Sequence, residues 1–184
     1  MNKAQARALL KEARAQVEDR ARKEARMNGA LLGFAPLRQA GTLFVYRAFG
    51  AEPPTQALIE ALLRQGKRVC LPRVEGREML AVPIGPDSAY RRGSFGILEP
   101  LGQPIPPEEV DLVVCPGLGF GRDGSRLGYG GGVYDRFLKK TAALRVGLCY
   151  NACIWQCVPA EEEDEKMHYL VSEAGVTSCR EGKT

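Results

Sequence analysis

Histidine is almost missing from this sequence, and its scarcity narrows the possible chemistry. His168 is the single histidine among the 184 residues. Nucleophilic catalysis by a serine or a cysteine needs a neighbouring base, most often histidine, that takes up the nucleophile's proton. No Ser–His–Asp or Cys–His pattern is present. We therefore expect a reaction that depends on positioning and charge stabilisation.

Long apolar runs are missing as well. No uninterrupted stretch approaches the roughly 20 residues that a membrane-spanning helix needs. Met1 leads into a charged helical pattern and not into an apolar leader. We therefore expect a cytoplasmic protein that makes no membrane contact.

A dense basic run with interleaved aromatic residues is also missing, and the formal net charge is only +4. Nucleic acid is therefore not expected as a partner. A mild positive excess suits small polyanionic ligands such as nucleotides, which a basic cleft attracts and concentrates. We expect a monomer that binds small molecules.

The sequence has six cysteines but no CxxC pair. Cys149, Cys153 and Cys157 recur every four residues and could share one helical face as metal ligands. We favour the alternative in which they are small buried side chains. Cys149 falls in a predicted strand, which breaks the helical register.

Strand and helix signals alternate along the chain. Residues 3–32 have the pattern of one long basic helix with a thin apolar stripe. Two strand–helix–strand units follow, at residues 42–47, 55–64 and 68–71, and at residues 110–115, 131–141 and 145–149. The alternation predicts a single three-layer α/β domain, in which helices cover both faces of a mainly parallel sheet.

The remaining segments carry weaker signals. Pro72 is expected to end the strand at 68–71, and the stretch between the two units is expected to form irregular strands and loops. Residues 169–172 could add a last strand. We expect residues 1–184 to form one domain, with a mobile tail from about residue 174.

A glycine-rich segment, residues 116–137, follows an apolar strand and leads into a predicted helix. Ligands of open α/β sheets bind beyond the carboxyl ends of the strands, where a helix N-terminus offers free amides. Four glycines at positions 128, 130, 131 and 132 remove side chains that would keep backbone amides away from phosphate. Arg126 can add a bidentate phosphate contact, and Asp135 supplies a carboxylate of the kind that binds magnesium. The spacing matches neither the GxGxxG nor the Walker pattern.

The string RLGYGGGVYDRF at residues 126–137 closely resembles the signature of the 5-formyltetrahydrofolate cyclo-ligase family, also called methenyltetrahydrofolate synthetases. Other pieces of the sequence resemble that family in the same order. They are KAQAR at 3–7, Glu52 ahead of Thr55, GKRVCLPR at 66–73, FGILEP at 95–100 and PGLGF at 116–120. The resemblance spans nearly the whole chain.

This resemblance implies an enzyme that uses ATP and Mg²⁺ to close 5-formyltetrahydrofolate into 5,10-methenyltetrahydrofolate, with release of ADP and phosphate through a phosphorylated formyl intermediate. It also implies residue roles, position by position. The ATP-binding residues would be Lys3, Arg7, Arg126, Leu127, Gly128, Tyr129, Gly130, Gly131, Gly132, Val133 and Tyr134. The folate-binding residues would be Glu52, Phe95, Tyr129, Gly130, Gly131, Gly132 and Val133. The metal ligands would be Asp135 and Asp164, and the catalytic residues Arg126, Tyr134 and Asp135.

Four positions depart from the family pattern. Gly121 stands where the family has Asp, and Val133 replaces the first tyrosine of a tyrosine pair. In the acidic segment that contains Asp164, Glu163 and His168 replace a histidine and an aspartate.

These departures leave two further classes of function open. One is a protein that binds folate or nucleotide on the same fold without turnover, as a reservoir or regulator. The other is an ATP-independent enzyme of related architecture, because such folds host many reactions. Lys3, Arg7 and Asp135 argue against the ATP-independent class, which has no evident need for them.

Overall fold

A seven-stranded sheet lies at the centre of the structure, a computed structural model that describes residues 1–179. The strands of this sheet are β1 Thr42–Val45, β2 Arg68–Glu75, β3 Glu78–Pro83, β6 Leu112–Cys115, β9 Leu144–Leu148, β11 Tyr169–Ser172 and β12 Gly175–Ser178. They are arranged in the order β12-β11-β9-β6-β1-β2-β3. The strands from β11 to β2 pair in parallel, and β12 and β3 join the two edges in antiparallel. The predicted mainly parallel sheet is confirmed.

Helices and short strands surround this sheet. The helices are α1 Lys3–Ala15, α2 Arg20–Gly33, α3 Ala35–Gln39, α4 Gln56–Arg64 and α5 Val133–Leu138, with short 3-10 turns η1 Ser94–Gly96, η2 Pro107–Glu109 and η3 Asn151–Cys153. The smaller strands are β4 Tyr90–Arg92, β5 Leu98–Pro100, β7 Gly119–Gly121, β8 Arg126–Leu127 and β10 Ile154–Trp155. β4 pairs with β5, and β10, β7 and β8 form a three-stranded sheet.

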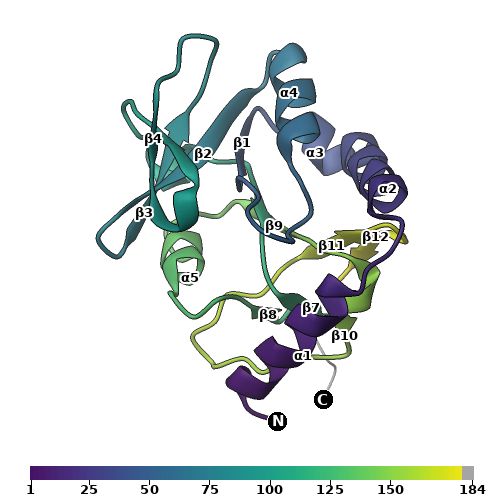
Figure 1. Cartoon of the computed structure of the whole chain (residues 1–184). Helices are drawn as coiled ribbons and strands as arrows, with labels where there is room; N and C mark the ends of the chain where they lie inside the picture. Colours follow the sequence, from purple (N-terminus) through teal and green to yellow (C-terminus); the bar gives the residue numbers. More distant parts are fainter. Residues whose placement is uncertain (180–184) are drawn as a thin grey trace.

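The two faces of the central sheet pack against different elements. Successive side chains of a strand point to opposite faces. Leu43 and Val45 of β1 pack in one apolar cluster with buried residues of α2, α3 and α4. Phe44, between them, packs in a second cluster with residues of α5, α1 and β7. Helices therefore cover both faces, as predicted (Figure 1).

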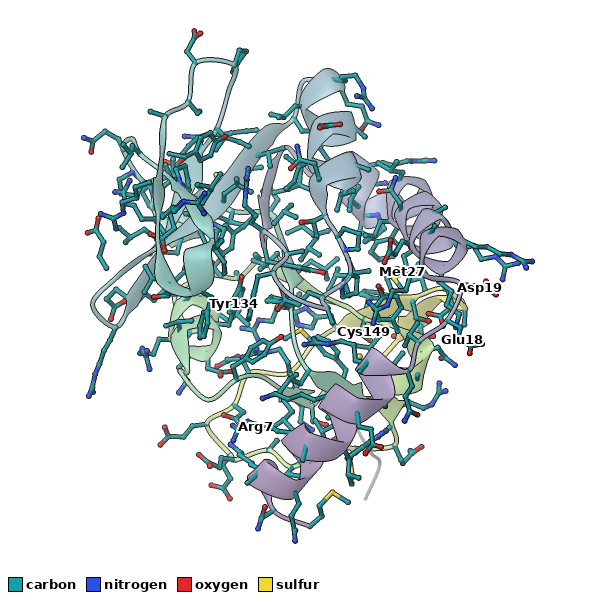
Figure 2. All side chains as sticks on the ribbon, viewed as in Figure 1. Arg7, Glu18, Asp19, Met27, Tyr134 and Cys149 are labelled. Atoms are coloured by element: carbon teal, nitrogen blue, oxygen red, sulfur yellow. The ribbon has the colours of Figure 1, made fainter. Side chains whose placement is uncertain are left out.

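The prediction of one helix over residues 3–32 is wrong. α1 ends at Ala15 and α2 begins at Arg20, and Asp19 has a left-handed backbone with φ of 49°. Glu18 and Asp19 lie in the connection between the two helices (Figure 2). Leu10 of α1 and Leu31 of α2 belong to the apolar clusters on opposite faces of the sheet, so one straight helix could not bury both.

Three smaller expectations also need correction. Pro72 does not end its strand. Beyond Cys70, β2 is paired with β3 but no longer with β1. The N–H that proline lacks on the β1 side therefore costs the sheet no hydrogen bond. Residues 79–82 belong to the regular strand β3. The tail expected from residue 174 begins with β12, which pairs with β11; residues 180–184 lie outside the described part of the chain.

Within residues 1–179 no helix has the length and apolar character needed to cross a membrane.

Candidate active site

A cleft of about 540 Å³ lies beyond the carboxyl ends of β1, β2 and β6. Tyr46 follows β1, Val74 lies near the end of β2 and Pro116 follows β6, and all three line the cleft. This is the edge at which parallel α/β sheets bind their ligands. The cleft also contains every residue that the sequence predicted for binding or catalysis: Lys3, Arg7, Glu52, Phe95, all positions from Arg126 to Asp135, and Asp164.

The glycine-rich loop forms one wall of this cleft. Gly130 and Gly132 have φ of +106° and +65°, a region that residues with a side chain rarely adopt. Gly131 has an ordinary backbone, and a methyl group added there would meet no atom within 4 Å. The loop is fixed from outside by α1, because Arg7 Nε donates a hydrogen bond of 2.9 Å to the Gly128 carbonyl. Figure 2 shows Arg7 on α1 and Tyr134 at the start of α5, on either side of this loop.

Arg126 and Asp135 form an ion pair at the base of the loop. The distance from Arg126 Nη2 to Asp135 Oδ2 is 2.9 Å, and the two side chains are 6% and 19% exposed. The guanidinium group also lies 5.5 Å from the centre of the Tyr134 ring. Burial raises the pKa of Tyr134 well above its ordinary value, so its hydroxyl stays protonated at neutral pH. Tyr134 is therefore suited to supporting Arg126 and not to acting as a base.

Lys3 and Asp164 form a second ion pair of the cleft. Lys3 Nζ lies 3.0 Å from Asp164 Oδ2 and 2.9 Å from Glu161 Oε1. The pKa of Asp164 is lowered, because the Glu161 amide and the Lys3 ammonium favour the charged carboxylate more than its partial burial disfavours it. Burial lowers the pKa of Lys3, but the neighbouring carboxylates of Glu161 and Asp164 raise it by more, so the net shift is upward. Both groups are charged at neutral pH.

Glu52 is one of two deeply enclosed acids of the cleft; it and Glu99 each have 6% of their surface exposed. One carboxylate oxygen of Glu52 accepts a hydrogen bond from the Phe49 amide (3.0 Å) and the other lies 3.2 Å from the Tyr129 hydroxyl. That hydroxyl in turn accepts a hydrogen bond of 2.8 Å from Arg14 Nη2. Burial raises the pKa of Glu52, and the Phe49 amide, the Arg14 charge and the Tyr129 hydroxyl partly offset this.

An aromatic pair closes one end of the cleft. The rings of Phe49 and Phe95 stack with centroids 5.0 Å apart and planes 13° apart, and Phe49 also packs against Tyr129. Phe95 lies in η1 with φ of 59° and is 76% exposed. The sequence left open whether Phe95 is a core residue or a stacking residue. Its exposure and its position on the cleft favour the stacking role.

Known proteins resemble this chain over most of its length. A model of the 5-formyltetrahydrofolate cyclo-ligase family matches residues 1–173. The chain belongs to this family. Among its curated relatives, the 5-formyltetrahydrofolate cyclo-ligase of Haemophilus influenzae is 35% identical over 136 residues, which cover 69% of this chain and 73% of the relative. The enzyme of the same name from Escherichia coli K12 is 31% identical over 155 residues, covering 79% and 85%.

A solved structure of a related protein has the same fold as this chain. The structure of Aquifex aeolicus 5,10-methenyltetrahydrofolate synthetase matches with a TM-score of 0.87 and 29% sequence identity, covering 100% of this chain and 96% of that one. The sequence-based assignment to the cyclo-ligase family, and to its α/β fold, is confirmed.

Three of the four departures from the cyclo-ligase pattern lie outside the cleft. Gly121 is buried in β7, where a Cβ atom would collide with the Asp123 and Ser125 side chains. Glu163 faces solvent, and His168 Nδ1 accepts a hydrogen bond from the Arg145 amide. Only Val133 lines the cleft. The effect of the departures on the site is therefore concentrated at this one position.

Sequence reasoning missed several residues in or next to the cyclo-ligase cleft. Arg14 lies behind the cleft residue Tyr129; it is 7% exposed and donates a second hydrogen bond, of 3.4 Å, to the Gly117 carbonyl. Phe49 and Glu161 were not singled out either, although both line the cleft. The available signal was helical spacing, since Lys3, Arg7 and Arg14 recur at intervals that place them on one face of α1.

Among residues 1–179, the cysteines do not form a group that could hold a metal ion. Cys149 and Cys153 are buried, Cys157 is exposed, and all six cysteines are free thiols. Burial raises the pKa of Cys149 and Cys153, so both remain protonated at neutral pH. The favoured interpretation, small buried side chains, holds for two of the three.

Proposed function

We propose that this protein catalyses the ATP- and Mg²⁺-dependent cyclisation of 5-formyltetrahydrofolate to 5,10-methenyltetrahydrofolate, with release of ADP and phosphate. The observation that carries the proposal is the convergence of five separated segments on one cleft. Lys3 and Arg7, Glu52, Phe95, the glycine-rich loop and Asp164 all line it. A site for two substrates requires such a combination: cations and free amides for phosphates, and an enclosed acid beside aromatic rings for a heterocycle.

The glycine-rich loop and the cations around it are assigned to the nucleotide. The open space at Gly131 lets backbone approach phosphate oxygens. Arg126 is held in place by Asp135 and by the Tyr134 ring, so it loses little conformational freedom when it binds a phosphate. Lys3 and Arg7 add positive charge from α1 on the other side of the loop. Phosphoryl transfer depends mainly on this kind of positioning and charge stabilisation.

Asp135 and Asp164 are assigned to magnesium. The chemistry of the donors fits the ion, because Mg²⁺ is typically held by one or two carboxylates together with substrate phosphates and waters. Both side chains are about one-fifth exposed and line the cleft. Each is paired with a cation, Arg126 or Lys3, that also lies at the proposed phosphate site. When bound, the ion would neutralise negative charge on the transferring phosphate.

Glu52 is assigned to the pterin ring of the folate. Pterin N–H groups are donors that an ionised carboxylate accepts. The Phe49 amide and the Tyr129 hydroxyl fix the orientation of Glu52. Tyr129 also belongs to the glycine-rich loop, so the residue that contacts Glu52 is part of the loop assigned to the nucleotide. Binding of the pterin at Glu52 would thus place the folate beside the nucleotide.

The reaction then proceeds in two steps. The formyl oxygen attacks the γ-phosphorus, the bond to ADP breaks, and the formyl group becomes phosphorylated. The neighbouring amine nitrogen, N10 of the folate, attacks the activated carbon; the carbon–oxygen bond breaks, phosphate leaves with that oxygen, and N10 loses its proton. ATP is required because the formyl oxygen is a poor leaving group until it carries a phosphate. The protein supplies no nucleophile, in agreement with the absence of a catalytic histidine pattern.

Product formation tests this proposal directly. Purified protein is mixed with 5-formyltetrahydrofolate, and absorbance of the methenyl product is followed with and without Mg-ATP. We expect product only with Mg-ATP. Absence of product with intact protein and active folate would contradict the proposal. Retained ATP or folate affinity in that case would favour the alternative, a non-catalytic binding protein, for which Val133 in the cleft is the motivating feature.

We further propose that the protein acts as a monomer in the cytoplasm, as a single domain, and binds neither nucleic acid nor membrane. Its small-molecule cleft is formed by one copy of the chain. Size-exclusion chromatography with light scattering tests the oligomeric state.

A further inference from the structure

The segment of residues 90–100 forms one end of the cleft without belonging to the central sheet. It consists of β4, η1 and β5, and we call it the β4–β5 arm. Within residues 1–179, β4 and β5 pair with each other and with no strand of the central sheet. Ser94, Phe95, Ile97 and Glu99 of the arm line the cleft. The attachment of the arm to the sheet therefore decides where this wall of the cleft lies.

The arm packs against β2, along the edge that β1 has left. In an antiparallel pair, residues alternate between positions that exchange hydrogen bonds with the partner strand and positions whose backbone groups point away from it. Pro72, which has no N–H, lies opposite Ala81, and the Ala81 carbonyl accepts a hydrogen bond from the Ile105 amide on the side away from β2. Val74, two residues after Pro72, has the same orientation. Its N–H and its carbonyl therefore point away from β3 and need other partners.

Glu99 and Arg91 of the arm supply these partners. Glu99 Oε1 accepts a hydrogen bond of 3.1 Å from the Val74 amide, and Glu99 Oε2 lies 3.3 Å from Arg91 Nε. Arg91 Nη2 in turn donates a hydrogen bond of 3.4 Å to the Val74 carbonyl. An ion pair of the arm thus binds both backbone groups of one β2 residue, at a place where a neighbouring strand would otherwise pair.

Glu99 is enclosed by the arm. Its side chain is 7% exposed, whereas that of Arg91 is 45% exposed. A Cβ atom added at Gly93 would lie 2.4 Å from Glu99 Cδ, so the backbone of the arm passes directly over the carboxylate. Loss of the carboxylate would leave the Val74 N–H and the Arg91 guanidinium without these partners, and an unsatisfied donor is costly in a packed interface.

The ring that depends on this attachment is Phe95. Its backbone is left-handed, with φ of 59°, and a residue with a bulky side chain keeps such a conformation only where the surrounding structure holds it. The ring stacks on Phe49 with 5.0 Å between the centroids. The Phe49 amide in turn donates to Glu52. The arm therefore ends at the group assigned to the pterin.

We propose that Glu99 is a positioning residue: by fastening the β4–β5 arm to β2, it holds the Phe95 ring against Phe49 at the folate end of the cleft. The inference rests on the proposed function. Glu99 acts through Phe95 and does not itself bind a substrate. Arg73 of β2 fastens the far end of the arm independently, because its Nη1 donates to the Pro100 and Gly102 carbonyls at 3.1 and 2.8 Å. Loss of Glu99 should therefore free the arm without unfolding the protein.

Limited proteolysis measures the attachment without any ligand. Trypsin cleaves after arginine, and Arg91 and Arg92 are exposed in β4. Cleavage of a folded segment follows the population of its open state. The arm of Glu99→Ala should therefore be cut about tenfold faster than that of wild type, as expected for loss of one charge-assisted hydrogen bond. Cleavage after Arg77, which is exposed in the turn between β2 and β3, should be unchanged and serves as the internal reference.

Calorimetry measures the consequence for the two ligands. Glu99→Ala should raise the Kd for 5-formyltetrahydrofolate about three- to tenfold, the effect expected for loss of one aromatic contact. The Kd for ATP should keep its wild-type value, because the residues assigned to the nucleotide lie in the glycine-rich loop and on α1. A general loss of structure would weaken the binding of both ligands.

Glu99→Gln separates attachment from substrate contact. The glutamine oxygen can still accept the Val74 N–H, and the lost pair with the half-exposed Arg91 contributes little. Arm cleavage and folate affinity should therefore both return close to their wild-type values. A carboxylate that bound the folate directly would not be rescued in this way.

Phe95→Ala tests whether Glu99 acts through that ring. Residues that act through one another have non-additive effects. The double variant Glu99→Ala, Phe95→Ala should therefore bind folate no more weakly than Phe95→Ala alone.

Asp111→Ala is the matched control. Asp111 Oδ2 accepts hydrogen bonds from the Gly41 and Thr42 amides at 2.9 and 2.8 Å, so it also fastens one segment to another, but it does not line the cleft. This variant should have a lower melting temperature, with unchanged arm cleavage and unchanged folate affinity.

The outcomes separate this inference from the proposed function. Wild-type arm cleavage in Glu99→Ala, or a freed arm with wild-type folate affinity, would overturn the inference while the proposed function stands. Additive effects of the two substitutions, or folate binding by Glu99→Gln as weak as that by Glu99→Ala, would make Glu99 a direct ligand and overturn it as well. If wild type binds folate without forming product, the proposed function fails and the same measurements still decide the positioning role. If wild type binds no folate, both fail.

Discussion

Arg126 and Asp135 are nine residues apart in the sequence and bind each other in the cleft, with 2.9 Å between Nη2 and Oδ2. The first is assigned to phosphate and the second to magnesium, so the ion pair holds together two groups of opposite charge that face the same ligand. Each side chain orients the other before the nucleotide binds. A substitution of either residue therefore affects both charges of the site.

Asp135→Asn should abolish productive use of magnesium while leaving folate binding nearly intact. An amide oxygen cannot match the charge of a carboxylate for a hard dication. We expect a higher magnesium midpoint and a strongly reduced maximal rate when magnesium is titrated at saturating ATP and folate. An unchanged midpoint and rate would remove Asp135 from the active site.

Asp111→Asn is the matched control for this prediction. Asp111 accepts hydrogen bonds from the Gly41 and Thr42 amides and does not line the cleft. Its loss should lower the melting temperature without moving the magnesium midpoint. The comparison separates a structural carboxylate from one that serves the metal.

Arg126→Ala should weaken ATP binding and slow turnover together. A charge-assisted hydrogen bond to phosphate contributes about 1.5 to 3 kcal/mol, which corresponds to roughly ten- to hundredfold in affinity. The measurement is ATP affinity by calorimetry alongside steady-state kinetics. Arg73→Ala is the control, because Arg73 is equally buried at 8% exposed but does not line the cleft. Normal ATP affinity and rate in Arg126→Ala would show that this arginine is not a phosphate ligand.

Gly131→Ala should separate activity from stability. The added methyl group meets no protein atom within 4 Å and the backbone needs no positive φ. The free energy of unfolding should change by less than about 1 kcal/mol, whereas the methyl group should raise the KM for ATP about tenfold by holding phosphate away from the backbone.

Gly130→Ala provides the contrast, since its φ of +106° makes any side chain strained. That variant should lose stability as well as activity. A Gly131→Ala protein with wild-type ATP kinetics would place the phosphates away from this part of the loop.

Tyr129→Phe should shift the pH dependence of folate binding. Burial already raises the pKa of Glu52, and the Tyr129 hydroxyl lowers it in part. Removal of that hydroxyl raises the pKa of Glu52 further, so protonation begins at a higher pH as the solution is acidified. Folate KM, measured between neutral and acidic pH, should therefore start to rise at a higher pH than in wild type.

The phenylalanine retains the ring that packs against Phe49, so the fold should be preserved. Tyr150→Phe is the control, because the Tyr150 hydroxyl contacts Glu24 and Arg20 outside the cleft. Identical pH profiles for Tyr129→Phe and wild type would show that the hydroxyl does not tune Glu52.

Features whose parts lie close together along the chain could be predicted from the amino-acid sequence alone. The apolar runs at β1, β6 and β9 predicted parallel strands, because strands buried on both faces must be apolar on both. The glycine loop, Arg126 and Asp135 are contained in ten consecutive residues, so their proximity followed from the sequence. The family resemblance added Lys3, Glu52 and Asp164, and the structure brings all of them to the same cleft.

Contacts between side chains that are far apart in the sequence became evident only in the folded structure. Arg14 reaches Tyr129 and, through it, Glu52, which lies in a different segment. The basic pattern of residues 3–32 could not reveal this, since it is equally compatible with a solvated helix. The break at Asp19 has the same origin: α1 and α2 bury their apolar residues in clusters on opposite faces of the sheet. Helical periodicity specifies a buried face, but the surface against which it packs is set by the rest of the fold.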